Sequence, residues 1–208
     1  MRIGILGTAT FATALATGWT RAGHDVIVGG RSPERAKAAA QASGAQARPL
    51  SEIGEGCDAV LLSVHWEGIA DILAAAGAAA GSLAGKPLID PTNAVDHGYG
   101  VLRTEPGRAI AHRVAELAPG AHVVKALNLF PSTRWTTSSP SPSAVAMCGD
   151  DPRALEVVGS LVRDLGGVPS VLGGLDRARQ LEEVAGFVIA LAFAGVDPQS
   201  AIPALPQP

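Results

Sequence analysis

The chain has 208 residues, of which 47% are hydrophobic and only 4% are aromatic. The hydrophobic share excludes a disordered chain, and the length favours one domain with a small appended part. Lys and Arg number 16 against 19 Asp and Glu, a formal charge of −3 with no basic block, so we expect no nucleic-acid partner. The two cysteines, Cys57 and Cys148, lie far apart in the sequence. They exclude a disulfide scaffold and a cysteine-rich zinc site, and they favour a reducing compartment.

Two apolar segments bear on targeting and membranes. The apolar run within residues 1–7 is far too short for the hydrophobic region of a signal peptide, and no cleavage site follows it. The longest apolar stretch, residues 184–196, is shorter than the roughly 20 residues that a membrane-spanning helix needs. We therefore expect a cytoplasmic protein with no membrane partner.

Short β-branched runs alternate with alanine-rich segments of helical length, which is the pattern of βαβ units. Strands are predicted at residues 2–6, 25–29, 58–64, 86–90, 122–127, 143–148 and 168–172. Helices are predicted at residues 10–21, from 33 onward, and at 66–80, 107–117, 151–165 and 176–194. Residues 131–143 are expected to form a loop, and residues 203–208 a frayed tail. The predicted fold class is α/β, with a doubly wound, mostly parallel sheet.

The turn after the first strand carries the sequence Gly7, Thr8, Ala9, Thr10 and Phe11. Dinucleotide-binding folds place a tight glycine turn here, so that backbone N–H groups at the start of the helix face a pyrophosphate. The usual pattern is Gly-x-Gly-x-x-Gly, whereas this chain has Gly-x-Ala-x-x-Ala. Ala9 puts a methyl group where the phosphates approach the backbone. The alternative is another α/β turn that happens to hold one glycine.

The second strand ends in Gly30, Arg31 and Ser32, without a carboxylate. NAD-selective members of dinucleotide-binding folds carry an acidic residue here for the ribose 2′-hydroxyl. Arg31 can instead bind a 2′-phosphate, Arg35 can add a second cation one helical turn on, and Ser32 can cap the helix and donate to the same phosphate. These residues favour NADPH over NADH. The alternative is a solvated basic helix start, which the helix dipole disfavours.

The third and fourth strands end in further candidate residues. Because the carboxyl ends of parallel strands line the ligand crevice, we expect Ser63, Val64 and His65 to wall the cofactor. His65 can act as an acid or base, although a histidine packed on a ribose or on Trp66 is commoner. The Asn93 amide and the Thr92 hydroxyl can hold the nicotinamide carboxamide, or residues 91–93 can form an ordinary turn. His97, His112 and His122 show no metal-ligand spacing, so no metal is expected.

Several weak motifs occur together in one order along the chain: residues 2–8, 30–32, 63–67, 123–128 and 148–151, then Gly174, Leu175, Arg179 and Glu182. With these motifs the chain resembles the NADPH-dependent deazaflavin (coenzyme F420) reductases and their wider group of small NADP-binding reductases. That group also includes the nucleotide domain of membrane metalloreductases. The resemblance covers nearly the whole chain.

The resemblance implies a Rossmann domain over residues 1–150. It also implies a small helical extension over residues 151–208, which completes the acceptor site and provides a dimer contact. A homodimer would transfer hydride between NADP(H) and a flat acceptor, and residues 129–131 would line the acceptor site. Asn128 stands where the deazaflavin reductases tend to carry a histidine, and residues 125–128 look closer to the metalloreductase branch. Asn128 and His65 are the candidate catalytic residues.

Three functions remain open from the sequence. The leading one is an NADPH-dependent reductase whose acceptor is a deazaflavin, so that coenzyme F420 would be a co-substrate. The second reduces a small imine or carbonyl compound, which usually needs a proton donor that His65 can supply and Asn128 cannot. The third is a non-catalytic NADP(H)-binding protein. The apolar face of the last helix suits either the core or a dimer interface.

Overall fold

A computed structural model describes residues 1–96, 98–136 and 142–202. It contains one eight-stranded sheet in the order β3-β2-β1-β4-β5-β6-β7-β8. The strands are β1 (Arg2–Leu6), β2 (Asp25–Gly29), β3 (Gln46–Ala47), β4 (Ala59–Leu62), β5 (Pro87–Asp90), β6 (His122–Lys125), β7 (Ala144–Gly149) and β8 (Val168–Val171). Only the β6–β7 pairing is antiparallel. The predicted doubly wound, mostly parallel sheet is confirmed.

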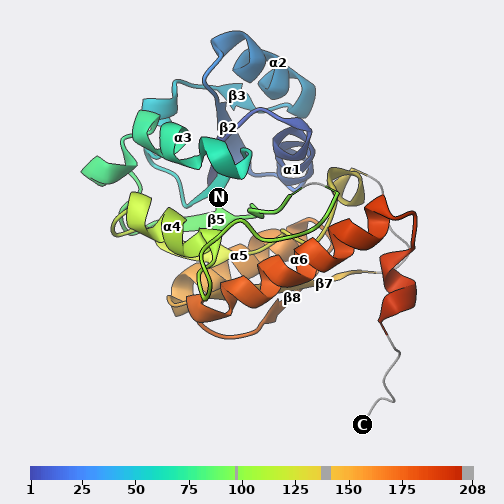
Figure 1. The fold of residues 1–208 in the computed structure, drawn as a ribbon. Coiled ribbons are helices and arrows are strands. Elements are labelled where there is room, and N and C mark those ends of the chain that lie inside the picture. Colours follow the sequence, from blue (N-terminus) through green and yellow to red (C-terminus); the bar gives the residue numbers. More distant parts are fainter. Residues whose placement is uncertain (97, 137–141, 203–208) are drawn as a thin grey trace.

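Helices cover both faces of this sheet (Figure 1). They are α1 (Thr10–Arg21), α2 (Pro33–Ser43), α3 (Ile69–Ala75), α4 (Ile110–Leu117), α5 (Pro152–Asp164) and α6 (Ala178–Phe193). Side chains from α3, α4 and the first half of α6 share one buried cluster, and side chains from α1, α2 and α5 share the other. Among the described residues, no helix is long and apolar enough to cross a bilayer.

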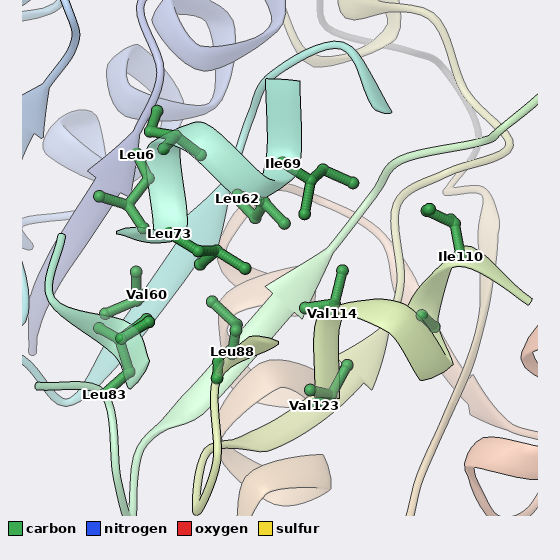
Figure 2. Close-up of a cluster of buried hydrophobic side chains, with 14 of the residues drawn as sticks. Leu6, Val60, Leu62, Ile69, Leu73, Leu83, Leu88, Ile110, Val114 and Val123 are labelled. Atoms are coloured by element: carbon green, nitrogen blue, oxygen red, sulfur yellow. The ribbon is translucent and has the colours of Figure 1, made fainter. Parts of the chain in front are cut away.

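The buried cluster under α3 and α4 joins these helices to the middle of the sheet. In Figure 2, Leu62 of β4 and Leu88 of β5 lie beside Ile69 and Leu73 of α3 and Val114 of α4. Each of these five side chains is at most 2% exposed. Burying a side chain of this size contributes about 1.5–3 kcal/mol. This packing fixes the loops that follow β4 and β5.

The opposite face is packed by α1 and α5. Leu15, Trp19, Val158 and Leu161 are almost fully buried there. The indole Nε1 of Trp19 donates a hydrogen bond to the carbonyl oxygen of Leu161 at 3.0 Å, so the largest core side chain is also satisfied as a donor. This contact ties α1, and with it the turn before α1, to the C-terminal third of the chain.

Several predicted elements differ from the structure. The helix predicted at 66–80 is broken, because Gly77 adopts a left-handed conformation (φ 71°) and ends the helical run after α3. The edge strand β3 has only two residues, too few to show a periodic pattern. Within the loop predicted at 131–143, Ser132–Trp135 forms a 3₁₀ turn. Residue 97, residues 137–141 and the predicted tail at 203–208 lie outside the described residues.

The order of the strands creates a crevice at one edge of the sheet. The chain leaves β1 toward β2 on one side, and β4 pairs with β1 on the other side. At such a switch point, the loops after neighbouring parallel strands separate and leave room for a ligand. The loops after β1, β2, β4, β5 and β6 all begin at this edge of the sheet.

Candidate functional site

Two adjoining pockets lie at the carboxyl ends of the strands. The first, called here the β2 pocket, has a volume of about 470 Å³ and is lined by Gly7, Thr8, Ala9, Gly30, Arg31, Ser32, Arg35, Ser63, Val64, His65 and Ile72. The second, called here the β5 pocket, has a volume of about 460 Å³. It is lined by Ala9, Phe11, Ser63, Val64, His65, Trp66, Pro91, Thr92, Asn93, Val95, Leu127, Asn128, Phe130 and Ile189. The pockets share four residues and so form one continuous site.

The structure brings together nearly all the residues that the sequence singled out. Every predicted site residue except Thr10 lines one of the two pockets. Thr10 instead lines an adjoining hollow between α1 and α2, which shares Thr8 and Arg35 with the β2 pocket. Of residues 129–131, expected at the acceptor site, only Phe130 is among the lining residues.

The turn after β1 depends on Gly7. Its φ of 136° is rare for any residue with a side chain, and an added Cβ would lie 1.8 Å from the carbonyl oxygen of Ser63. The Gly7 amide donates to the carbonyl oxygen of Gly29 at 2.8 Å, and the Ser63 amide donates to that of Leu6 at 2.8 Å. The ends of β1, β2 and β4 therefore meet closely at the floor of the β2 pocket.

Helix α1 begins directly above this floor. Its N-cap residue, Ala9, makes no side-chain hydrogen bond, and the first turn holds no acidic residue. The first N–H groups of a helix have no partner within the helix, so they remain available to an anion. Ala9 itself has φ −76° and ψ 172°, an extended conformation that any residue adopts. The departure from glycine at Ala9 therefore adds only a methyl group, which lies where the two pockets meet.

Two arginines give the β2 pocket its positive charge. Arg31 is 69% exposed at its side chain and lies 3.9 Å from the carboxylate of Asp71 on α3. An exposed pair at this distance is weak, so it leaves Arg31 able to bind a ligand anion. The Ser32 hydroxyl accepts a hydrogen bond from the backbone N–H of Arg35 at 3.2 Å, which confirms the predicted cap. The same hydroxyl donates to Glu34 at 2.8 Å, so a 2′-phosphate would have to compete for it.

The β5 pocket is mostly apolar and holds an interlocked pair of amides. The side-chain N–H₂ of Asn93 donates to the carbonyl oxygen of Asn128 at 2.9 Å, and that of Asn128 donates to the Asn93 side-chain oxygen at 3.0 Å. Asn128 also donates to the carbonyl oxygen of Leu181 at 3.1 Å. Both amide hydrogens of Asn128 are thus engaged, while Asn93 keeps one hydrogen for a ligand. Asn128 therefore holds the Asn93 side chain in place.

The backbone before Asn128 is strained. Leu127 has φ 64°, and it is the only residue other than glycine with positive φ among the described residues. A bulky residue in this region costs about 1–3 kcal/mol, and such residues occur preferentially at functional sites. The turn at Leu127 brings Asn128 to face Asn93 across 35 positions of sequence.

His65 lies at the junction of the two pockets. Its side chain is 54% exposed, and Nδ1 lies 3.4 Å from the Glu67 carboxylate. Its ring centroid is 5.8 Å from that of Trp66. The expected packing against Trp66 is therefore present, and the exposed ring can still reach a ligand in either pocket.

The sequence did not predict several residues of the β5 pocket. Trp66 begins the predicted helix at 66–80, and Val95 lies two positions after Asn93. Their places beside His65 and Asn93 in the sequence could have suggested both as lining residues. Ile189 comes from α6, more than 50 residues after the loop that it faces, and only the tertiary fold brings it there. Among residues 1–96, 98–136 and 142–202, no three His, Cys, Asp or Glu side chains lie close enough to hold a metal ion.

The cysteines are not candidates for chemistry in this site. Cys57 and Cys148 are buried and free. Burial raises the pKa of the Cys57 thiol to about 11 and that of Cys148 to about 12. A reactive cysteine needs a thiolate at neutral pH, so both residues act as small apolar core residues.

Residues 2–94 match the family described as NADP oxidoreductase, coenzyme F420-dependent. The chain is 30% identical over 186 residues to the metalloreductase STEAP3 of Rattus norvegicus, a match that covers 88% of this chain and 36% of that protein. The chain thus spans about a third of this curated relative.

Two solved structures share the fold. An F420 dependent NADP-reductase from Arthrobacter sp. FB24 superposes with a TM-score of 0.81 at 23% identity, over 94% of this chain and 96% of that one. A reductive aminase from Aspergillus terreus in complex with NADPH superposes with a TM-score of 0.68 at 21% identity, over 93% and 62%. By the match over residues 2–94 and by these relatives, the chain is similar to NADP oxidoreductases of the coenzyme F420-dependent family.

Proposed function

We propose that the chain binds NADP(H) across the two pockets and transfers a hydride between its nicotinamide and an acceptor stacked in the β5 pocket. The observation that carries this proposal is the continuity of the site. A cationic pocket beside an uncapped helix start runs into an apolar pocket lined by aromatic side chains. This sequence of environments matches a phosphate-bearing nucleotide at one end and a flat ring at the other.

The residues present fit such a cofactor. The first-turn N–H groups of α1 would hold the pyrophosphate, and Arg31 and Arg35 would hold the 2′-phosphate. In the β5 pocket, the remaining amide hydrogen of Asn93 would hold the nicotinamide carboxamide. When bound, the cofactor supplies the hydride chemistry, and the protein supplies position and orientation. Asn128 would act by fixing Asn93, and His65 would supply or take a proton where the acceptor requires one.

A titration with NADPH and NADH tests the nucleotide half of the proposal. We expect Arg31→Ala to weaken NADPH binding by roughly 1–3 kcal/mol, the contribution of a charge-assisted hydrogen bond, and to leave NADH binding nearly unchanged. Arg113→Ala, which removes a similarly exposed arginine on α4, is the matched control and should change neither affinity. Equal losses for NADPH and NADH in Arg31→Ala would contradict the assignment of the 2′-phosphate to this residue.

For the acceptor we propose a deazaflavin, coenzyme F420. The family match over residues 2–94 and the apolar walls of the β5 pocket support a flat, stacked acceptor. Mixing the protein with NADPH and oxidised F420 should bleach the deazaflavin absorbance. Absence of bleaching, with NADPH bound, would rule out this acceptor.

A small imine or carbonyl compound is the second candidate acceptor. The fold shared with a reductive aminase and the exposed ring of His65 at the pocket junction support it. NADPH oxidation by cyclic imines, lost in His65→Phe, would favour this candidate. NADPH binding without turnover on either class would favour a non-catalytic binding protein.

We further propose that the chain works in the cytoplasm as a homodimer, with residues 151–208 as the part that completes the acceptor site. The buried free cysteines support a reducing compartment. Ile189 of helix α6 lines the β5 pocket, and Val184 and Phe187 of the same helix are exposed to solvent. Exposed apolar side chains at this spacing favour a subunit contact. Sedimentation that detects only monomer would remove the dimer from the proposal.

A further inference from the structure

Three fully buried charged residues lie directly behind the β5 pocket. The ammonium of Lys125 lies 3.1 Å from a carboxylate oxygen of Asp90 and 2.8 Å from one of Glu182. All three side chains are 0% exposed. They come from the ends of β5 and β6 and from α6, and no site function proposed above uses them.

Each charged group in this cluster is well satisfied by hydrogen bonds. Asp90 accepts from the backbone N–H and the hydroxyl of Thr92, at 2.8 and 2.6 Å. Glu182 accepts from the backbone N–H groups of Ile110 and Ala111, at 2.9 and 3.3 Å, and so caps the start of α4. Lys125 also donates to the carbonyl oxygen of Thr92. The cluster is therefore rigid and fully paired.

The cluster carries a net negative charge. Burial alone would lower the pKa of Lys125, but attraction to Asp90 and then to Glu182 outweighs it and raises this pKa above its ordinary value. Lys125 is thus charged, and two carboxylates face one ammonium. The start of α4 adds roughly half a positive elementary charge, which offsets only part of the excess.

A single residue, Thr92, connects the charged cluster to the β5 pocket. Thr92 lines the β5 pocket, and the same residue bonds to both Asp90 and Lys125. All three charges are out of water, so their field on the pocket is screened less than that of surface groups. A ring in the β5 pocket therefore lies near a buried cluster whose summed charge is negative.

We propose that the Asp90–Lys125–Glu182 cluster makes the β5 pocket selective for a ring that bears positive charge, so that it favours oxidised over reduced nicotinamide. The inference rests on the proposed function. Loss of a hydride turns a neutral dihydronicotinamide into a ring with one positive charge, and fixed charge placed where charge develops stabilises that change. Asp90 and Glu182 are then positioning residues whose charge acts on the ring through the pocket wall.

The test compares the affinities of NADP⁺, NADPH and 2′,5′-ADP, which lacks the nicotinamide. In Glu182→Gln, we expect the ratio of the dissociation constants, NADP⁺ over NADPH, to rise about threefold or more. The 2′,5′-ADP affinity should stay within about twofold, because that probe reaches only the β2 pocket. Glu183→Gln is the matched control, since it makes the same change on an exposed side chain one position on, and it should leave the ratio unchanged.

Asp90→Asn provides a second variant in case loss of the Glu182 cap prevents folding, and it should raise the ratio in the same direction. Lys125→Met removes the positive charge instead, so it should not raise the ratio. An unchanged ratio in folded Glu182→Gln and Asp90→Asn proteins overturns this inference alone. A wild-type protein that binds neither NADP⁺ nor NADPH overturns the proposed function as well.

Discussion

The two pockets are built in different ways. The β2 pocket comes mainly from three short segments, residues 7–9, 30–35 and 63–65, each of which directly follows a strand. The β5 pocket draws on segments from Phe11 to Ile189, and its polar groups are held by contacts across tens of residues. A site made of local turns can be read from sequence motifs. A site made of contacts between distant residues can be recognised only from the three-dimensional structure. We expect substitutions in the two pockets to differ accordingly in their effects on stability and ligand binding.

The largest effect is expected on stability, from a substitution in the turn after β1 at the floor of the β2 pocket. Gly7→Ala places a Cβ against the Ser63 carbonyl oxygen in a backbone conformation that alanine disfavours. We expect the free energy of unfolding to fall by about 3 kcal/mol or more. Gly23→Ala is the control, because Gly23 also has positive φ but its added Cβ meets nothing within 4 Å. Urea unfolding measures both, and similar losses in the two variants would show that the close approach to Ser63 is unimportant.

A moderate effect is expected on ligand affinity, and it should differ between ligands that occupy both pockets and ligands that occupy only the β2 pocket. Asn93→Ala removes the amide that faces the β5 pocket, so NADPH binding should weaken by about 1 kcal/mol, the net value of one hydrogen bond. Binding of 2′,5′-ADP should be unaffected, whereas Arg31→Ala should weaken both compounds. Calorimetric titration of the two variants with the two compounds measures this pattern. Parallel losses for both compounds in Asn93→Ala would mean that the pockets do not divide the ligand as proposed.

The smallest effect is expected where the pockets meet. Ala9→Gly removes one methyl group from an extended N-cap residue that needs no glycine for its backbone. NADPH binding should tighten by no more than about 1 kcal/mol, the scale of one methyl group. The free energy of unfolding should rise by less than about 1 kcal/mol, because glycine is the better N-cap. A much larger gain in affinity would show that Ala9 obstructs the phosphates severely.

The sequence predicted the parts of the molecule whose patterns are local. Three such features depend mainly on residues close together in the sequence: the apolar runs of the strands, the Ser32 cap and the turn at Gly7. The structure contains all three as expected. The break at Gly77 was missed because an alanine-rich segment has high helix propensity on both sides of it.

The charges behind the β5 pocket were missed for a different reason. Lys125 and Glu182 belong to two separate motifs of the sequence, 57 positions apart (182 − 125), and nothing in either motif indicates that they pair. Only the packing of α6 across the ends of β5 and β6 brings them together out of water. The sequence indicated Asn128 as a catalytic candidate but not its contact with Asn93. That contact depends on the strained turn at Leu127.

A crystal structure of the chain grown with NADP⁺ tests the two-pocket site most directly. We predict the 2′-phosphate beside Arg31 and Arg35, the pyrophosphate against the first turn of α1, and the nicotinamide in the β5 pocket next to Asn93. A dinucleotide bound away from the strand ends, or bound with its nicotinamide outside the β5 pocket, would contradict the assignment of these two pockets to one cofactor.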